Sequence, residues 1–351
     1  MVNSIKEENK IIIFCQAPAD MPYFLSLYEK YKEEKVILVY VINVENIFKF
    51  IKGLNLNLHS LVFIPYASIS FKNVFQIIKE RKRIEFFKIK YFDFVTKADV
   101  FFFSRFEDWL TSSFLVTLKK KNSIFYIDYY DNSAIYFNKT SKSIRLKFFG
   151  LILKYLTGVN FKLDIVEKLP EFPIDSYNID KLDAILNPDV FFNYSYKFNI
   201  PLSNKSNIIF FISECDSAIY DFKFYDFKLK SIINDLKKNG FYVVVKGHPR
   251  IGIPESIREI SDYEIPSYVP GEFINIEEFK FCLGLDTNAI CYFAKSNKLP
   301  TYSLIRMFPT LNIEMIEILV NFLKNQSGNK IKFIDNDDQF YTFIENILSN
   351  E

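Results

Sequence analysis

The sequence lacks several features that mark common kinds of functional site. It has only nine glycines, and neither half carries GxGxxG after its first strand or a GxxxxGKS/T loop, which disfavours a dinucleotide fingerprint and a P-loop. The four cysteines have no metal-type spacing, and no Asp-x-Asp cluster stands in a metal-binding setting. Three of these cysteines lie in apolar surroundings, which is typical of reduced, buried thiols in the cytosol.

Long apolar runs and a strong excess of charge are also missing. No apolar run reaches the roughly 18 residues needed to span a bilayer. Residues 1–10 are polar and include acidic residues, so we expect no signal peptide and a cytoplasmic protein. A net charge of +2 does not favour nucleic-acid binding.

One segment, residues 141–156, alternates basic and apolar side chains. We prefer to interpret it as a helix packed on a sheet with its lysines in water. The alternative is an interfacial helix, which would give peripheral contact with the inner membrane surface.

Short apolar runs alternate with segments of helical spacing through both halves of the chain. Strands are expected at 10–15, 36–42, 61–65, 99–104, 124–128, 208–213, 241–245, 281–285 and 301–305. This alternation predicts an α/β fold of two Rossmann-like, doubly wound domains facing a cleft. We expect domains at 1–200 (with a linker) and 201–335, and a last helix at 336–351 that could pack back on the first domain.

The most informative stretch is the basic turn Lys246-Gly247-His248-Pro249-Arg250, which follows a predicted buried strand. The chain has only two histidines, and one of them lies here. Open α/β sheets bind ligands at the carboxyl ends of their strands, so this turn is placed to bind a phosphate. The histidine can donate to a phosphate oxygen or protonate it as it leaves.

Two further stretches of the second half could bind an anion or a nucleotide. Asp286-Thr287-Asn288 precedes a predicted helix, where it can act as an N-cap or as an anion site. Pro270-Gly271-Glu272 is a turn whose glutamate could hold a ribose or a base.

Two acidic stretches are candidates for a general base. Asp131 lies in Tyr130-Asp131-Asn132-Ser133, after the fifth strand of the first half, and spacing alone favours an ordinary turn there. Glu214 and Asp216 follow the first strand of the second half and are rival bases or ligands for substrate hydroxyls.

Together these stretches resemble the bacterial sialyltransferases of the two-domain GT-B type, which include lipooligosaccharide sialyltransferases and capsular polysialyltransferases. That family carries an Asp/Glu-Asp/Glu-Gly motif, then a His-Pro motif, then a Ser/Thr pair. His248-Pro249 matches the second motif in full, and the order and spacing of the three motifs agree over roughly residues 100–305.

The other two motifs are incomplete. Tyr130 and Asn132 replace the first acid and the glycine of the first motif, while Asp131 keeps the second acid. Of the hydroxyl pair only Thr287 remains, after Asp286. These departures leave open both the base and the sugar, which could be sialic, legionaminic or pseudaminic acid.

The resemblance implies an inverting glycosyltransferase that moves a nonulosonic acid from a CMP-sugar to a glycan acceptor such as lipooligosaccharide or capsule. It implies that Asp131 takes the acceptor proton, that His248 stabilises or protonates the leaving phosphate, and that neither a metal nor another cofactor is needed. The first domain would then serve the acceptor and the second the CMP-sugar. The residues expected to bind the donor are Lys246, Gly247, Pro249, Arg250, Gly271, Glu272, Asp286, Thr287 and Asn288.

Two other classes of function stay open at this point. A GT-B enzyme that uses a UDP-sugar, as a transferase or an epimerase, would share the architecture. A non-catalytic polysaccharide-assembly protein would bind glycan without hydrolysing a donor. The acceptor, its linkage and the oligomeric state do not follow from the sequence.

Overall fold

The structure is a computed structural model that describes most of the chain. It leaves undescribed residues 1–9, 67–72, 104–107, 130–143, 163–170, 198–206, 214–220, 250–251, 278, 297, 311 and 350–351, and the side chains of 144–147, 222 and 223. The chain divides into two compact units, Met1–Val190 (unit 1) and Phe191–Glu351 (unit 2).

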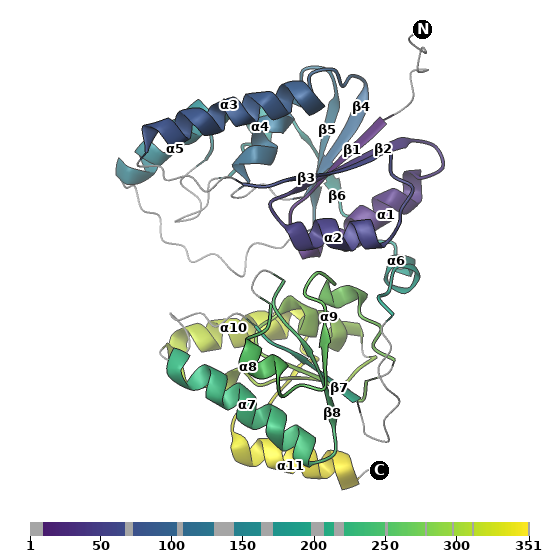
Figure 1. Cartoon of the computed structure of the whole chain (residues 1–351), viewed down its shortest axis with the longest axis vertical. Helices are drawn as coiled ribbons and strands as arrows, with labels where there is room; N and C mark the ends of the chain where they lie inside the picture. Colours follow the sequence, from purple (N-terminus) through teal and green to yellow (C-terminus); the bar gives the residue numbers. More distant parts are fainter. Residues whose placement is uncertain are drawn as a thin grey trace. The chain divides into compact units, whose positions relative to one another are not determined.

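Unit 1 is built on a parallel sheet of six strands in the order β3-β2-β1-β4-β5-β6 (Figure 1). The strands are β1 Lys10–Cys15, β2 Val36–Ile42, β3 Ser60–Ile64, β4 Ala98–Phe102, β5 Ser123–Asp128 and β6 Asp180–Asp183. The order reverses between β1 and β4. Open α/β sheets bind ligands beside such a switch point, at the carboxyl ends of the strands.

Helices cover both faces of this sheet. They are η1 Pro18–Asp20, α1 Met21–Tyr31, α2 Glu45–Gly53, α3 Val74–Tyr91, α4 Trp109–Leu118, α5 Ile144–Thr157 and η3 Asp175–Tyr177. The short helix α6 Asp189–Asn193 spans the division between the two units. Ile12 and Phe14 of β1 belong to the same buried cluster as Ile84 of α3 and Leu153 of α5. Successive side chains of a strand point to opposite faces, and α1 and α2 lie on the other face of the sheet (Figure 1).

Unit 2 repeats this plan with the sheet order β12-β11-β10-β7-β8-β9. The strands are β7 Asn207–Phe211, β8 Tyr242–Lys246, β9 Tyr263–Ile265, β10 Phe281–Gly284, β11 Thr301–Ser303 and β12 Lys332–Phe333. Numbered within its own unit and read from its opposite edge, this sheet has the same strand order as unit 1. Its switch point lies between β7 and β10.

The helices of unit 2 also cover two faces of the sheet. They are α7 Phe222–Lys238, α8 Glu255–Arg258, η4 Gly271–Phe273, α9 Asn288–Ser296, η5 Ile305–Met307, α10 Ile313–Gln326 and α11 Asp337–Ser349. Phe340 and Ile344 of α11 are buried in the cluster that holds Ile208 of β7. The last helix thus packs its apolar face on the core of unit 2. That it also packs back on the first domain stays a prediction.

The predicted fold class, two Rossmann-like doubly wound halves, is confirmed. The sequence did not indicate β6, β9, β12 or α10, and β6 lies at the edge of its sheet with every residue exposed.

Candidate functional site

Three strands of unit 2 end side by side at its switch point. In the ladder Phe211 of β7 lies opposite both Lys246 of β8 and Gly284 of β10. The loops that follow are therefore close together. The backbone N–H of Asp286, after β10, donates to the hydroxyl of Ser213, after β7, at 3.4 Å. The predicted phosphate turn follows β8, and the predicted helix N-terminus follows β10. Both therefore lie at the same edge of the unit 2 sheet.

Close packing in the turn after β8 explains why position 247 is a glycine. Gly247 is buried, and a Cβ placed there would lie 2.4 Å from the carbonyl oxygen of Gly252 and 2.5 Å from Ile253. The loop folds back on itself because the N–H of Gly252 donates to the carbonyl of His248 at 2.8 Å. The chain can pass this point only without a side chain. His248 and Pro249 follow directly and are partly exposed.

Lys246 lies under this turn and not on its surface. It is 2% exposed, and its ammonium donates to the carbonyl of Gly247 at 2.7 Å and to that of Ser267 at 3.4 Å. Burial lowers the pKa of Lys246 to about 8, although the charges of Glu272 and Glu264 oppose this effect. Its contacts favour a role in holding the turn, and its direct binding to a phosphate stays a prediction.

The Pro270-Gly271-Glu272 turn packs against the same sheet edge. A Cβ on Gly271 would lie 2.5 Å from the Cβ of Ala289 in α9 and 3.1 Å from the Phe211 ring, so this turn also needs a glycine. Burial raises the pKa of Glu272, while the nearby Lys246 charge lowers it. A carboxyl group therefore lies within electrostatic reach of the buried ammonium beneath the His248 turn.

Helix α9 begins at Asn288, shortly after β10 ends at Gly284, so its N-terminus lies at this sheet edge. The hydroxyl of Thr287 accepts a hydrogen bond from the N–H of Ala289 at 3.4 Å, so it acts as a weak N-cap. Thr287 is partly exposed and Asn288 is exposed. Helix N-termini of this kind bind anions because their N–H groups and the helix dipole favour negative charge.

Unit 2 therefore gathers most of the predicted donor-binding residues at one sheet edge. The remaining predicted site residues, Asp131, Glu214, Asp216 and Arg250, lie outside the described residues. Their roles stay predictions.

The switch point of unit 1 has a different character, which the sequence reading did not reveal. Asp20, after β1, is fully buried. One of its carboxylate oxygens accepts from the N–H groups of Gln16 and Ala17 at 2.6 and 2.8 Å, and the other accepts from the hydroxyl of Tyr129 at 2.6 Å. Burial raises the pKa of Asp20 to about 6 against these hydrogen bonds, and the negative charge of Asp108 adds to the rise.

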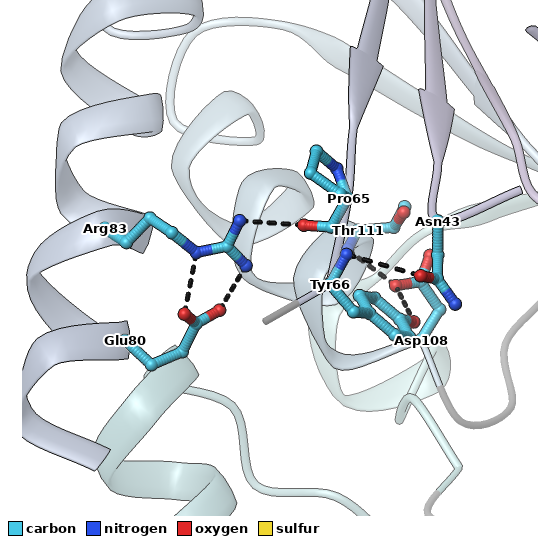
Figure 2. Close-up of polar contacts among 7 residues, drawn as sticks. All are labelled: Asn43, Pro65, Tyr66, Glu80, Arg83, Asp108 and Thr111. Carbon is cyan, nitrogen blue, oxygen red and sulfur yellow. Dashed lines mark hydrogen bonds and ion pairs between the residues drawn. The ribbon is translucent and has the colours of Figure 1, made fainter. Parts of the chain in front are cut away.

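Asp108 is the second buried carboxyl group of this region. It is 5% exposed and caps α4, since its Oδ1 accepts from the N–H of Thr111 at 3.1 Å and from the hydroxyl of Tyr66 at 2.8 Å (Figure 2). Within the described part of the chain its Oδ2 is buried without a hydrogen-bond partner. Burial raises the pKa of Asp108 too.

The two carboxyl groups belong to one network of polar side chains. The Gln16 amide donates to the hydroxyl of Thr111 at 2.9 Å, which links the loop after β1 to the start of α4. Figure 2 also shows Tyr66 held by the Asn43 side chain, which accepts from the Tyr66 N–H at 3.3 Å. Because Asp20 and Asp108 have almost no exposed surface, we assign them to positioning the loops of this edge.

Tyr129 joins this network to the segment that contains the predicted base, Asp131. It lies directly after β5 and two positions before Asp131 in the sequence. Its ring stacks on Tyr23 with centroids 4.4 Å apart, and its hydroxyl donates to Asp20. The chain is thereby fixed at the switch point of unit 1 just before the segment that contains Asp131.

The three described cysteines lie in the protein interior. Cys15, Cys282 and Cys291 are buried, as predicted, and burial raises the pKa of each thiol. Within the described ranges, no three His, Cys, Asp or Glu side chains gather into a metal-binding group.

Comparisons with known proteins show the fold of the chain but not its family. No family model matches it. An uncharacterized protein of Methanocaldococcus jannaschii is 28% identical over 196 residues, which are 56% of this chain and 32% of that protein. The match thus spans about a third of that relative's own length.

Solved structures resemble the whole chain at low sequence identity. A UDP-N-acetylglucosamine 2-epimerase has a TM-score of 0.50 at 12% identity, over 98% of this chain and 88% of its own. The enzyme of that name from Neisseria meningitidis, bound to UDP-GlcNAc, has a TM-score of 0.48 at 12% identity, over 97% and 100%. The glycosyltransferase SnogD from Streptomyces nogalater has a TM-score of 0.47 at 7% identity, over 97% and 91%.

The first of these likenesses, together with the two sheets of equal strand order, establishes the class of fold. The chain is a two-domain α/β protein with Rossmann-like halves of the GT-B type.

Proposed function

We propose that the protein is an inverting glycosyltransferase that moves a sialic acid or related nonulosonic acid from a CMP-sugar to a hydroxyl of a surface glycan, at the cytoplasmic side of the inner membrane. The observation that carries the proposal is the shared edge of β8, β7 and β10. There the Gly247-His248 turn and the N-terminus of α9 follow strands that end in register. This edge offers a histidine and the N-terminus of a helix to a phosphate.

In the reaction the acceptor oxygen attacks the anomeric carbon while the bond from that carbon to the CMP phosphate oxygen breaks, which inverts the configuration. Asp131 takes the proton of the acceptor hydroxyl. His248 donates a hydrogen bond or a proton to the departing phosphate. Thr287 and the N-terminus of α9 stabilise the charge that develops on it.

The other residues at this edge position the donor. Glu272 binds the ribose of the nucleotide, and buried Lys246 keeps the turn in shape under His248. Asp286 and Asn288 flank the capping threonine, while Gly271 lets the ribose-binding turn approach α9. Pro249 restricts the turn after the histidine, and Arg250 adds positive charge for the phosphate.

The base is tested by a comparison of carboxylates. Asp131→Asn should cost far more rate than Glu214→Gln or Asp216→Asn, because only Asp131 matches the second acid of the family motif. The opposite order of effects would move the base to the second domain. Circular dichroism of each variant serves as the control for folding.

A second candidate function is a GT-B enzyme that acts on a UDP-sugar, as a transferase or an epimerase. It is favoured by the likeness in fold to a UDP-N-acetylglucosamine 2-epimerase. The two candidates differ in the base that the nucleotide site accepts and in the number of phosphates between the nucleoside and the sugar.

Thermal shifts with CMP and UDP, followed by a donor-hydrolysis screen across CMP-sugars and UDP-sugars, separate these candidates. The proposal expects stabilisation by CMP and slow hydrolysis of a CMP-nonulosonate. Stabilisation by UDP alone, with turnover of a UDP-sugar, would establish the second candidate. No stabilisation by either nucleotide would point to a non-catalytic assembly protein.

A further inference from the structure

Helix α3 presents apolar side chains to solvent on the side opposite its buried face. Its buried residues are Ile77, Glu80 and Ile84. Its exposed apolar side chains include Phe75 at 84%, Ile78 at 38%, Phe86 at 57% and Ile89 at 64%. The spacing of these four positions places them on one stripe of the helix. A second apolar stripe is not needed to pack the core, so it marks an interaction surface.

Helix α5 repeats this arrangement. Leu153 and Leu156 are buried in the core, whereas Phe148 at 63%, Leu151 at 65% and Tyr155 at 46% are exposed. The exposed positions again share one side of the helix. The preferred interpretation of residues 141–156, a helix packed on the sheet with its lysines in water, is confirmed for the described side chains, since Leu153 and Leu156 are buried and Lys154 is exposed. The exposed apolar side chains are a further feature that this interpretation did not include.

The two helices lie side by side on the same face of the sheet (Figure 1). The Arg81 guanidinium of α3 lies 4.3 Å from the centroid of the Tyr155 ring of α5. We define the α3/α5 face as the exposed apolar residues Phe75, Ile78, Phe86, Ile89, Phe148, Leu151 and Tyr155 with the basic residues around them.

The charge of this face is strongly positive. Helix α3 has six basic residues and two acidic ones. Of the two acids, Glu80 is buried against Arg83, and Glu85 pairs with Lys88 at 2.9 Å. Between the helices lies a pocket of about 380 Å³ lined by Arg81, Lys88 and Lys154 together with Glu85 and Leu151. An anionic group the size of a phosphate would fit beside exposed apolar side chains.

We propose that the α3/α5 face binds the surface of an anionic phospholipid bilayer. The exposed aromatic and aliphatic side chains enter the boundary between headgroups and acyl chains, and the surrounding cations contact lipid phosphates. Protein interfaces are depleted in lysine, whereas this face is rich in it, so the composition favours anionic lipid over a second copy of the chain. Among the described helices none is long and apolar enough to cross a membrane.

The test is co-sedimentation of the full chain with vesicles of phosphatidylcholine alone and with vesicles that contain about one-third phosphatidylglycerol. The chain should bind the anionic vesicles more tightly, and salt should weaken this binding. Phe75→Ser with Phe86→Ser should lower the partition coefficient about 30-fold. Lys82→Gln with Lys90→Gln should lower it about 20-fold on anionic vesicles only.

The matched control is Phe224→Ser with Phe227→Ser on α7, where the two rings are 52% and 71% exposed. It should leave vesicle binding unchanged. The proposal would be overturned if this control lost as much vesicle binding as the α3 variant. It would also be overturned if the chain bound neutral vesicles equally well, or bound no vesicles at all. A dimer in sedimentation velocity that Phe75→Ser with Phe86→Ser dissociates would overturn it too, because a second copy would then cover the face. None of these outcomes depends on which sugar nucleotide the protein uses.

Discussion

The two units share one strand order, yet the switch points of their sheets hold buried groups of opposite charge. In unit 1 the buried carboxyl groups of Asp20 and Asp108 lie at the edge formed by β1 and the start of α4. In unit 2 the buried ammonium of Lys246 lies at the edge formed by β7, β8 and β10. The fold places one switch point in each unit, and a few buried side chains give the two switch points different charges.

If the proposed function holds, unit 2 binds the leaving phosphate and unit 1 binds the acceptor. A buried cation and a helix N-terminus favour a leaving anion. Buried carboxyl groups disfavour an anion beside them. Substitutions that act on one edge at a time test whether the two switch points differ in this way.

The largest effect is expected for His248→Ala. Loss of a group that stabilises or protonates the leaving phosphate should slow transfer about 1,000-fold. The assay is CMP release from the CMP-sugar that the donor screen identifies, with thermal unfolding as the check on folding. The control is His59→Ala, which removes the other histidine at an exposed position and should keep full rate. Full activity of His248→Ala would break the assignment of leaving-group chemistry to unit 2.

The next effect concerns the buried carboxyl group of Asp20. Its pKa is 3.8 in the unfolded chain and about 6 in the fold, so the folded state binds more protons between these values. Stability should therefore fall as pH rises through this window, by about 3 kcal/mol in total, at about 1.4 kcal/mol for each pKa unit. Asp20→Asn removes this dependence, so its stability relative to the natural chain should rise from pH 4 to pH 7.

Urea unfolding followed by the fluorescence of Trp109 measures this effect in unit 1. Trp109 is the only tryptophan of the chain, it is 9% exposed, and its ring stacks on Tyr66 with centroids 5.3 Å apart. Asp183→Asn on the exposed strand β6 is the control and should leave the pH profile unchanged. Identical profiles for Asp20→Asn and the natural chain would contradict the role of burial at this edge.

A third substitution tests how closely the phosphate turn of unit 2 is packed. A methyl group on Gly247 would overlap the backbone of Gly252, so Gly247→Ala should cost about 1–3 kcal/mol and weaken nucleotide binding. Gly53→Ala is the matched control, because a Cβ there meets nothing within 4 Å at the end of α2. It should leave stability the same or raise it by about 0.5–1 kcal/mol. Equal stability of the two variants would mean that the turn is not packed as described.

Much of the fold could be predicted because its signals are local. A buried parallel strand such as Ile11–Phe14 or Val243–Val245 is a continuous apolar run, and such runs located most of the central strands. Strands β6, β9 and β12 were missed because they are short, at or near sheet edges, and carry little apolar pattern.

Part of the site of unit 2 could also be predicted from the sequence, since His248 and Thr287 each follow a predicted strand. The carboxyl network of unit 1 was not, because it depends on contacts between distant residues. Tyr129 and Asp20 are 109 positions apart, and Gln16 and Thr111 are 95 apart. The only local signal was an aspartate directly before α1, which by itself indicates a helix start.

The smallest effect is expected for Thr287→Ala at the start of α9. Its hydroxyl accepts the N–H of Ala289 over a long 3.4 Å, so loss of this cap should cost only about 0.5–1 kcal/mol. If Thr287 also contacts the donor phosphate, nucleotide binding should weaken by more than this small loss of stability explains. Thr287→Ser keeps the hydroxyl and should restore both properties, which thermal unfolding and nucleotide titration can measure. A Thr287→Ala variant with reduced stability and normal nucleotide affinity would make the residue a cap alone, and the anion site of unit 2 would then depend on the His248 turn.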